Sequence, residues 1–370
     1  MTAEVGHSLS LLEKLEPEEL KHTSKMADLR DTPEALGLPA EVSQSQSKGP
    51  KIGRIMDSVK KALYIMGSCL LLFAAARNSF HWQIHRLWGA TGSFWQSCWD
   101  YMYTHWGQEN DFWFCCIGTF VVTQGVFWLG NSFFMLLDVY GVPACLLKYK
   151  IQEDVKVEMP KLWKAVRQVV FNMLVVGVPF IFVASYLFQL RGGSSTIGGE
   201  LPTFTWVMLE ILIFSFVEEF CFYYSHRLLH HPRLYKHIHK LHHEWTAPIG
   251  IVAVYAHPVE HVISNILPPT LGPLIMGSHL ATAWLWFILA FLSTTISHCG
   301  YHLPLLPSPE AHDYHHLKFN QNFGVLGVLD RLHGTDIQFH ASKQYQRHVM
   351  LLNTVPLNSQ YPAEPKKKPE

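Results

Sequence analysis

The sequence predicts an all-α integral membrane protein with four to six membrane helices and a histidine-rich helical domain on the cytosolic side. Long uncharged apolar runs, loops of unequal basic charge and three histidine clusters with helical spacing support this class. The chain has 370 residues, no formal net charge and 49% apolar residues, values that a soluble protein could share. The prediction therefore rests on where the apolar residues lie along the chain, because their overall fraction does not distinguish a membrane protein from a soluble one.

The first part of the chain is polar. Residues 1 to 55 are rich in Glu, Ser, Lys and Pro without a sustained apolar period, which predicts a disordered cytosolic tail. No secretory signal precedes the first apolar run, residues 62 to 76, and this run is short for a bilayer span. We expect membrane helices and loops over residues 56 to 200, a catalytic-type domain over 201 to 345, and a cytosolic carboxy-terminal tail over 346 to 370.

Two later runs are long enough to cross about 30 Å of hydrocarbon. Residues 112 to 137 carry no formal charge and are bounded by Asp111 and Asp138. Residues 168 to 190 are also uncharged, and Pro179 within them is tolerable where neighbouring groups satisfy the freed carbonyl. Both runs are predicted membrane helices.

The next two apolar stretches carry polar or helix-breaking residues. Residues 204 to 224 contain Glu210, Glu218 and Glu219, which should face protein because exposing a carboxylate to lipid is costly. Residues 262 to 297 are apolar but interrupted by three prolines. We expect this stretch to form a hairpin that either dips into the membrane or crosses it.

Basic residues predict the orientation. The loop from 138 to 167 is rich in Lys and Arg, whereas the loop from 191 to 202 carries only Arg191, so the positive-inside rule places the first loop in the cytosol. The histidine clusters then lie at the cytosolic face, and both termini are cytosolic. The Lys366-Lys367-Lys368 end is typical of a retrieval signal for the endoplasmic reticulum membrane, and a solvated basic end is the alternative reading.

Three histidine clusters have spacings of three and four residues, which place imidazoles on one face of a helix. Their recurrence favours metal binding over interfacial histidines that only hydrogen-bond locally. At the first cluster, His231 is an alternative to His230. The candidate metal ligands are His226, His230, His231, His239, His242, His243, His298, His302, His312, His315 and His316.

The cysteines argue against other metal sites, since none of the seven forms a Cys-x-x-Cys pair. Imidazole suits iron, copper, zinc and nickel, so ligand type alone leaves the metal open. A site at the lipid boundary can meet a hydrophobic substrate, and oxidation of an unactivated C–H bond needs a redox metal. Two iron ions and dioxygen are therefore expected. His257, Glu260 and Asp313 are candidates for orienting the ligating imidazoles.

The three clusters resemble the histidine boxes of the sterol desaturase and fatty acid hydroxylase superfamily. Residues 256 to 260 and 330 to 336 extend this resemblance, which covers about residues 200 to 340. Residues 223 to 248 are similar to the C4-methylsterol monooxygenases within the superfamily. The segment from His298 to His302 instead has the His-x3-His form of the fatty acid hydroxylases.

The resemblance implies a non-haem di-iron monooxygenase of the endoplasmic reticulum that oxidises a lipid C–H bond with O2. The expected target is the C4-methyl group of a sterol in sterol biosynthesis, with a fatty acyl or sphingolipid chain as the alternative. A third hypothesis is a non-catalytic regulator or scaffold of lipid metabolism. Because no His-Pro-Gly-Gly haem signature is present, electrons should come from NAD(P)H through a separate cytochrome b5 and its reductase. No nucleic-acid partner is expected.

Overall fold

The structure is a computed structural model that describes residues 56, 59–60, 63–64, 66–68, 71, 82–192 and 195–362. The chain divides into two compact units, Met1–Cys69 and Leu70–Glu370, and the helices discussed below belong to the second unit. The predicted tail 1 to 55, most of the predicted run 62 to 76 and the Lys366-Lys367-Lys368 motif lie outside the described residues.

The described part of the chain is helical and holds no β-strand, only one isolated bridge between Lys150 and Tyr301. The predicted all-α class is confirmed. The α-helices are α5 (Trp82–Met102), α6 (Asp111–Tyr140), α7 (Met159–Phe171), α8 (Val178–Gly192), α9 (Ser195–Gly198), α10 (Phe204–Leu229), α11 (Pro232–Tyr235), α12 (Pro258–Glu260), α13 (Leu267–Met276), α14 (Leu280–His298), α15 (Glu310–Lys318), α16 (Val328–His333), α17 (Ile337–His340), α18 (Lys343–Arg347) and α19 (Leu357–Gln360). The π and 3-10 segments are η4 (Tyr103–Gly107), η5 (Ala144–Tyr149), η6 (Asn172–Gly177), η7 (His239–Glu244), η8 (Gly250–Val254) and η9 (His261–Ile266).

Within the described ranges, three helices are long and apolar enough to cross a membrane: Asp111–Tyr140, Met159–Gly192 and Leu280–His298. The first two contain the predicted runs 112 to 137 and 168 to 190. The second continues from α7 into α8 through the wider π-helical turn η6, which ends at Gly177, two residues before Pro179 and its missing N–H. The third is the second arm of the predicted hairpin, whose turn uses Gly277 in the left-handed conformation.

Helix α10 is not among these three spans, and it carries the three glutamates noted in the sequence. Its large apolar side chains Leu212, Phe216 and Phe220 are exposed and form one stripe at helical spacing. Glu210 and Glu219 are only 1% and 2% exposed on the other side. These two carboxylates therefore face protein, as predicted, whereas Glu218 is partly buried and lines a cavity.

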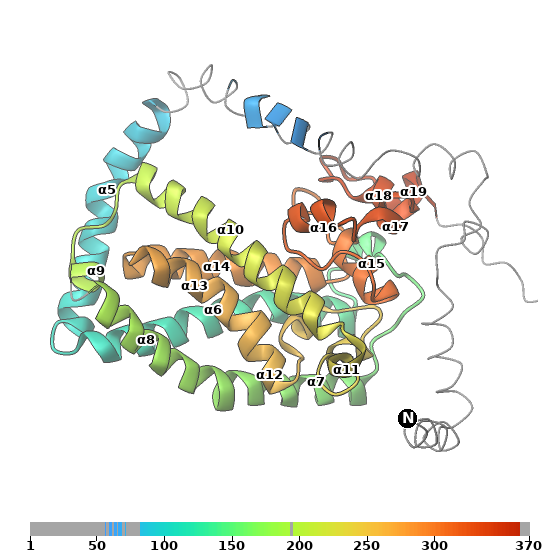
Figure 1. The fold of residues 1–370 in the computed structure, drawn as a ribbon, viewed down its shortest axis with the longest axis horizontal. Coiled ribbons are helices and arrows are strands. Elements are labelled where there is room, and N and C mark those ends of the chain that lie inside the picture. Colours follow the sequence, from blue (N-terminus) through green and yellow to red (C-terminus); the bar gives the residue numbers. More distant parts are fainter. Residues whose placement is uncertain are drawn as a thin grey trace, which may run out of the picture. The chain divides into compact units, whose positions relative to one another are not determined.

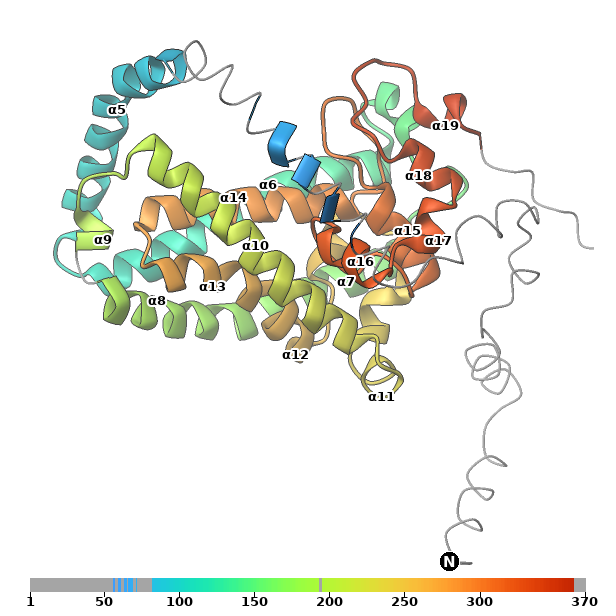
Figure 2. The ribbon, with the colours of Figure 1, turned by 45° about the horizontal axis from the view of Figure 1, so that its top comes forward.

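Helices α6 and α14 run in the same direction (Figures 1 and 2). The Trp284 indole donates to Thr119 near their starts, and the Asn131 amide lies 3.4 Å from the Thr295 hydroxyl near their ends. Helix α13 runs opposite to α10, and η9 meets the end of α10 through the hydroxyls of Ser264 and Ser225. The carboxyl ends of α6, α10 and α14 thus lie together, at the end of the molecule where the histidines are found.

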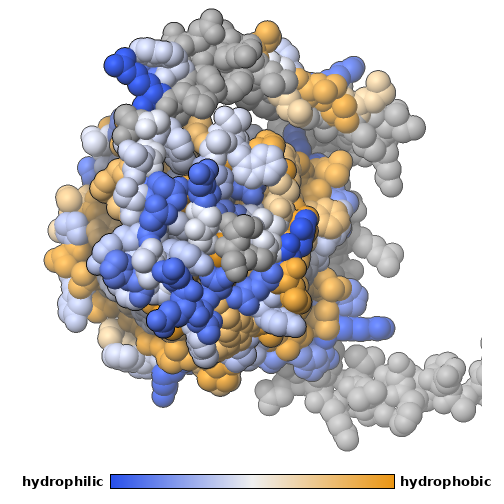
Figure 3. All heavy atoms as spheres, turned by 90° about the vertical axis from the view of Figure 1, so that its left-hand side faces the viewer, coloured by the Kyte–Doolittle hydropathy of each residue, from blue (hydrophilic) through white to orange (hydrophobic). Residues whose placement is uncertain are grey.

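The two loops of unequal basic charge lie at opposite ends of these helices. The loop after α6 reaches the histidine end, where Gln152 donates to Asp313 and Lys164 pairs with Glu244. The loop after α8 lies with α5 and α9 at the other end (Figure 1). On that face hydrophilic atoms gather at the centre and hydrophobic atoms occupy much of the margin (Figure 3), an arrangement suited to helices with polar ends and lipid-facing sides.

Candidate metal centre

Four elements bring the candidate ligands together at the histidine end. His226 lies in the last turn of α10, and His230 is its C-cap. The 3-10 segment η7 carries the second cluster, α14 ends on His298, and α15 carries the third cluster. The predicted clusters therefore converge from separate parts of the chain.

Nine histidines form two groups, and within each group the nearest ligand nitrogens all lie within 4.8 Å of one another. Neighbours in sequence are divided between the groups: η7 sends His243 to one and His242 to the other, and α15 does the same with His315 and His316. The first histidine group is His226, His230, His239, His243 and His315. The second histidine group is His242, His298, His312 and His316.

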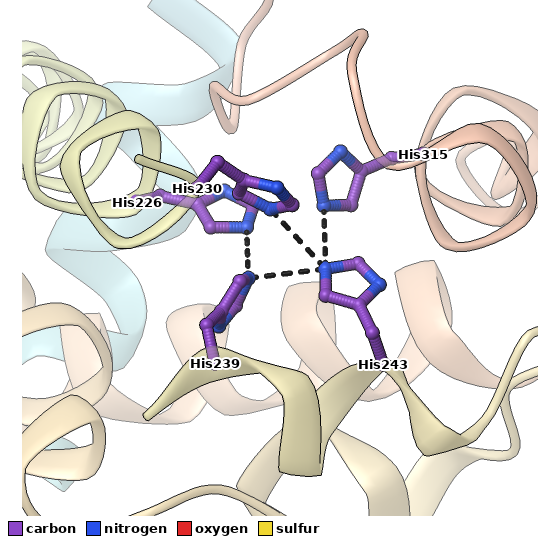
Figure 4. Close-up of side chains that lie close together, drawn as sticks. All are labelled: His226, His230, His239, His243 and His315. Carbon is purple, nitrogen blue, oxygen red and sulfur yellow. Dashed lines mark hydrogen bonds between the residues drawn. The ribbon is translucent and has the colours of Figure 1, made fainter. Parts of the chain in front are cut away.

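The first histidine group is arranged around His243 (Figure 4). The Nε2 atom of His243 lies 3.0 Å from Nε2 of His239 and 3.2 Å from Nε2 of both His230 and His315. A single imidazole N–H can satisfy only one of these three neighbours. Hydrogen bonding among the rings therefore cannot stabilise the whole arrangement, and a shared cation can.

The outer ring nitrogens of this group determine which atoms point inward. Nδ1 of His226 lies 2.8 Å from the carbonyl oxygen of Phe323, and Nδ1 of His315 lies 2.6 Å from that of Gln321. A carbonyl only accepts hydrogen bonds, so each Nδ1 carries the proton of the neutral ring. Nε2 of each ring then presents a lone pair to the centre of the group.

The second histidine group is held in the same way. Nδ1 of His242, His298 and His316 donates to the carbonyl oxygens of Tyr255, Thr294 and Trp245 at 3.1, 2.8 and 2.9 Å. The inward Nε2 of His316 is buried and has no hydrogen-bond partner. Nε2 of His312 and His298 lie 2.8 Å apart. Buried lone pairs aimed at one another are the arrangement expected of ligands that share a metal ion.

The spacings fit metal coordination. A transition metal binds imidazole nitrogen at about 2.1 Å, so two ligands at a right angle around one ion lie about 3.0 Å apart. The Nε2 separations of 3.0 to 3.2 Å in the first group match this distance. Its five donors also exceed the four that a closed tetrahedral zinc site uses. The residues present therefore fit one metal ion in each group.

Burial keeps these imidazoles in the form that binds metal. Loss of solvation lowers the pKa of His242 to about 4. It also holds the pKa values of His239, His243, His315 and His316 well below the ordinary value for histidine. A neutral imidazole offers its lone pair without first releasing a proton.

The three residues predicted to orient the ligands have different contacts. Glu260 is 2% exposed, and its Oε1 lies 2.9 Å from Nδ1 of His239. His257 instead caps α12 by accepting the N–H of Val259. Asp313 accepts from the Gln152 side-chain amide, and burial raises its pKa to about 7. Among the three, Glu260 is the residue whose contact touches a grouped imidazole.

Two predicted ligands lie outside both groups. His231 is exposed and caps α11 by accepting the N–H of Arg233, because the chain turns away from the site after α10. His302 is buried beside Glu310, at 3.7 Å, and its Nε2 lies 2.8 Å from the Val349 carbonyl. Glu310 also pairs with buried Arg347, so His302 belongs to a cluster that holds the carboxy-terminal segment.

The sequence did not predict which backbone carbonyls contact the imidazoles, because every residue has a carbonyl. One of them, Phe323, lies in a loop that two buried carboxylates hold by accepting backbone N–H groups. Asp330 accepts from Phe323 and Gly324, and Glu219 accepts from Val325, Leu326 and Leu329. Glu219 and Asp330 thus act on the imidazole of His226 through the loop that carries the Phe323 carbonyl.

A cavity of about 450 Å³ opens beside the second histidine group. His298 and His312 line it, together with apolar residues of α13 and α14 that include Pro269, Phe287 and Phe291. We call it the metal-side cavity. The rest of its lining is mixed, and includes the charged side chains of Glu218, Asp330 and Arg331. A concave space that combines apolar walls with polar groups beside a possible metal centre is a candidate small-molecule site.

The region that holds the two histidine groups is similar to known proteins. The family model described as fatty acid hydroxylase matches residues 211–335. Over 323 residues the chain is 50% identical to human fatty acid hydroxylase domain-containing protein 2, covering 86% of this chain and 96% of that protein. It is 35% identical to methylsterol monooxygenase 2-2 of Arabidopsis thaliana over 66% of this chain and 92% of that protein. It is 36% identical to fatty acid hydroxylase ahd1 of Mycosarcoma maydis over 56% and 54%.

No solved structure matches the chain. The family model spans all nine grouped histidines, and the human relative covers 86% of this chain and 96% of its own length at 50% identity. The chain therefore belongs to the fatty acid hydroxylase family.

Proposed function

We propose that the protein is a di-iron monooxygenase that inserts oxygen from O2 into a C–H bond of a membrane lipid, and that its substrate is the C4-methyl group of a sterol. One oxygen atom enters the C–H bond as a hydroxyl. The other leaves as water, which takes up two protons and two electrons. Bound iron would supply the redox chemistry that activates dioxygen, which zinc does not have.

The observation that carries this proposal is the position of the second histidine group on the metal-side cavity. His298 and His312 present nitrogen to a space whose other walls include Phe287 and Phe291. The imidazoles would hold the metals through neutral Nε2 atoms, and carbonyl contacts of Nδ1 orient five of the nine rings, those of His226, His242, His298, His315 and His316. The apolar walls on the side of α13 and α14 would direct a lipid carbon towards the centre.

The sterol assignment is supported by the likeness to a protein named methylsterol monooxygenase 2-2, which covers two thirds of this chain. The alternative substrate is a fatty acyl or sphingolipid chain. It is favoured by the likeness to a protein named fatty acid hydroxylase ahd1. Both reactions would use the same histidine groups, so the substrate that the cavity accepts separates them.

The remaining assignments follow from this reaction. We place the protein in the endoplasmic reticulum membrane with the histidine end and both termini in the cytosol. The loop rich in basic residues lies at that end, as the positive-inside rule requires. Electrons would come from NAD(P)H through cytochrome b5 and its reductase, which reach the site from the cytosol.

The test is oxidation by the purified full-length protein, reconstituted in lipid with iron, cytochrome b5, its reductase and NADH. Incubation with a 4,4-dimethyl sterol under 18O2 should give a sterol that carries one labelled oxygen, and His243→Ala should give none. Labelled hydroxyacyl lipid without labelled sterol would favour the acyl alternative. A cellular lipid phenotype rescued equally by a His239→Ala, His243→Ala double variant would favour the non-catalytic regulator instead.

A further inference from the structure

A second cavity of about 90 Å³ lies among helices α6, α8, α13 and α14. Its walls are mostly apolar and include Phe180, Ile181, Ala184 and Ala283. It is lined by none of the nine grouped histidines. We call it the tail cavity.

The tail cavity and the metal-side cavity adjoin. Six residues of η9, α13 and α14 line both cavities, so the two spaces meet at a common wall. These residues are His261, Asn265, Ile266, Pro269, Phe287 and Phe291.

Helix α14 connects the two cavities along one face. Leu280 and Ala283 line the tail cavity, Phe287 and Phe291 line both, and Thr294 and His298 line the metal-side cavity. These six positions are three or four residues apart, so they form one continuous stripe. A helix rises about 1.5 Å per residue, which gives this stripe a length of about 27 Å.

On the basis of the proposed function, we infer that the two cavities form one substrate channel along α14. The oxidised end of the lipid lies at His298 and His312, and its hydrocarbon tail lies in the tail cavity between α6 and α8. The sequence of residues along the stripe supports this direction. Its apolar end, at Leu280, is remote from the histidine groups, and its polar end is His298, a candidate metal ligand. The occupant is an elongated lipid with a long apolar end, which a sterol with its side chain and a long acyl chain both provide.

Ala184 offers a way to close the tail cavity without touching the metal groups. It lies on α8 and lines this cavity, whereas its neighbour Val183 on the same helix is 59% exposed. Ala184→Trp should fill the tail cavity. Val183→Trp adds a comparable bulk to the lipid-facing side and is the matched control.

The experiment is photolabelling of the full-length protein with a 4,4-dimethyl sterol that carries a diazirine at the end of its side chain. The label should map to peptides of α6 and α8, and Ala184→Trp should reduce it about tenfold because overpacking weakens binding. Val183→Trp should leave the label unchanged, and the iron content of both variants should equal that of the intact protein. A terminally labelled acyl lipid serves as the second probe.

The outcomes separate this inference from the proposed function. Sterol labelling confined to the metal-side cavity, or unaffected by Ala184→Trp, would overturn the channel even in a protein that oxidises sterols. Labelling of the tail cavity by the acyl probe alone would support the channel and count against the sterol substrate. Labelling needs no turnover, so an inactive preparation still tests the channel.

Discussion

The two histidine groups contain the same kind of ligand but differ in what surrounds them. None of the five members of the first group lines either described cavity, whereas the second group contributes His298 and His312 to the metal-side cavity. The first group also has a carboxylate contact, from Glu260 to His239, while the described outer contacts of the second group go to backbone carbonyls. Similar donor sets can therefore differ in access to substrate.

The groups also differ in how the chain builds them. Four members of the first group lie close in sequence, from His226 to His243, and only His315 comes from afar. The second group takes His242 from η7, His298 from α14 and two residues from α15. Its assembly depends on packing between distant elements, so it is the group more sensitive to changes in the helical core.

The largest expected effect is loss of a ligand from either group. His230→Ala in the first group and His312→Ala in the second should each abolish turnover and reduce bound metal from about two ions to about one. Both side chains are only partly buried, so their removal leaves small cavities. Metal analysis of the purified variants, together with the 18O2 assay, measures both effects.

His231→Ala is the matched control for His230→Ala, because the adjacent side chain is exposed and only caps α11. It should keep both metal ions and its activity, and lose at most about 1 kcal/mol from the missing cap. Full metal content in His230→Ala, with loss in His231→Ala, would reverse the assignment of the first group.

Lowering the pH should have a smaller effect, on the free energy of unfolding. This effect tests whether the second histidine group is shielded from water, as its burial indicates. In metal-free protein the pKa of His242 is lowered to about 4, whereas in the unfolded chain it is near 6.5. Below pH 6.5 the unfolded chain binds a proton that folded His242 does not take up. The free energy of unfolding should therefore fall between pH 6.5 and pH 4, by about 3 kcal/mol from this residue.

Thermal unfolding of the metal-free protein at a series of pH values measures this loss. His242→Asn removes the titrating ring while its side-chain amide can still donate to the Tyr255 carbonyl. The variant should show a shallower pH dependence between pH 6.5 and pH 4. The same pH dependence in the variant and the intact protein would show that water reaches His242.

The smallest expected effect comes from changing the carboxylate contact that the first histidine group has and the second lacks among its described contacts. Glu260→Gln weakens the contact with Nδ1 of His239 and should reduce metal affinity at the first group about 10- to 100-fold. The second group should be unaffected. Asp313→Asn is the control, since Asp313 contacts Gln152 and no grouped imidazole is among its hydrogen-bond partners. Equal losses of metal affinity in the two variants would show that the contact between Glu260 and His239 has no special role.

Much of the helical organisation could be predicted because apolar length is a local property. The run 112 to 137 became α6, and the acids of α10 were expected to face protein because lipid offers them no hydrogen bonds. The continuation of α7 through η6 into α8 was not predicted. It depends on a wide turn that accommodates Pro179, and such a turn has no simple pattern in sequence.

The sequence predicted eleven candidate ligands, and the structure brings nine of them into the two histidine groups. Spacing alone treats His230 and His231 alike, and it treats His298 and His302 as one pair. The structure separates them because α10 ends at His230, and because the chain after α14 turns His302 towards Glu310 and the Val349 carbonyl. A side chain four residues further on shares a face only while the helix continues.

The sequence by itself determined the membrane class and the histidines available for metal, since these follow from apolar length and from spacing, and it determined the family through its likeness to known relatives. Only the tertiary structure decided how those histidines divide. Neighbours such as His242 and His243 on the 3-10 segment η7, or His315 and His316 on the α-helix α15, point to different groups because successive residues of a helix project in different directions. It also decided which group meets the cavity, because that depends on where α14 packs against α15 and α13.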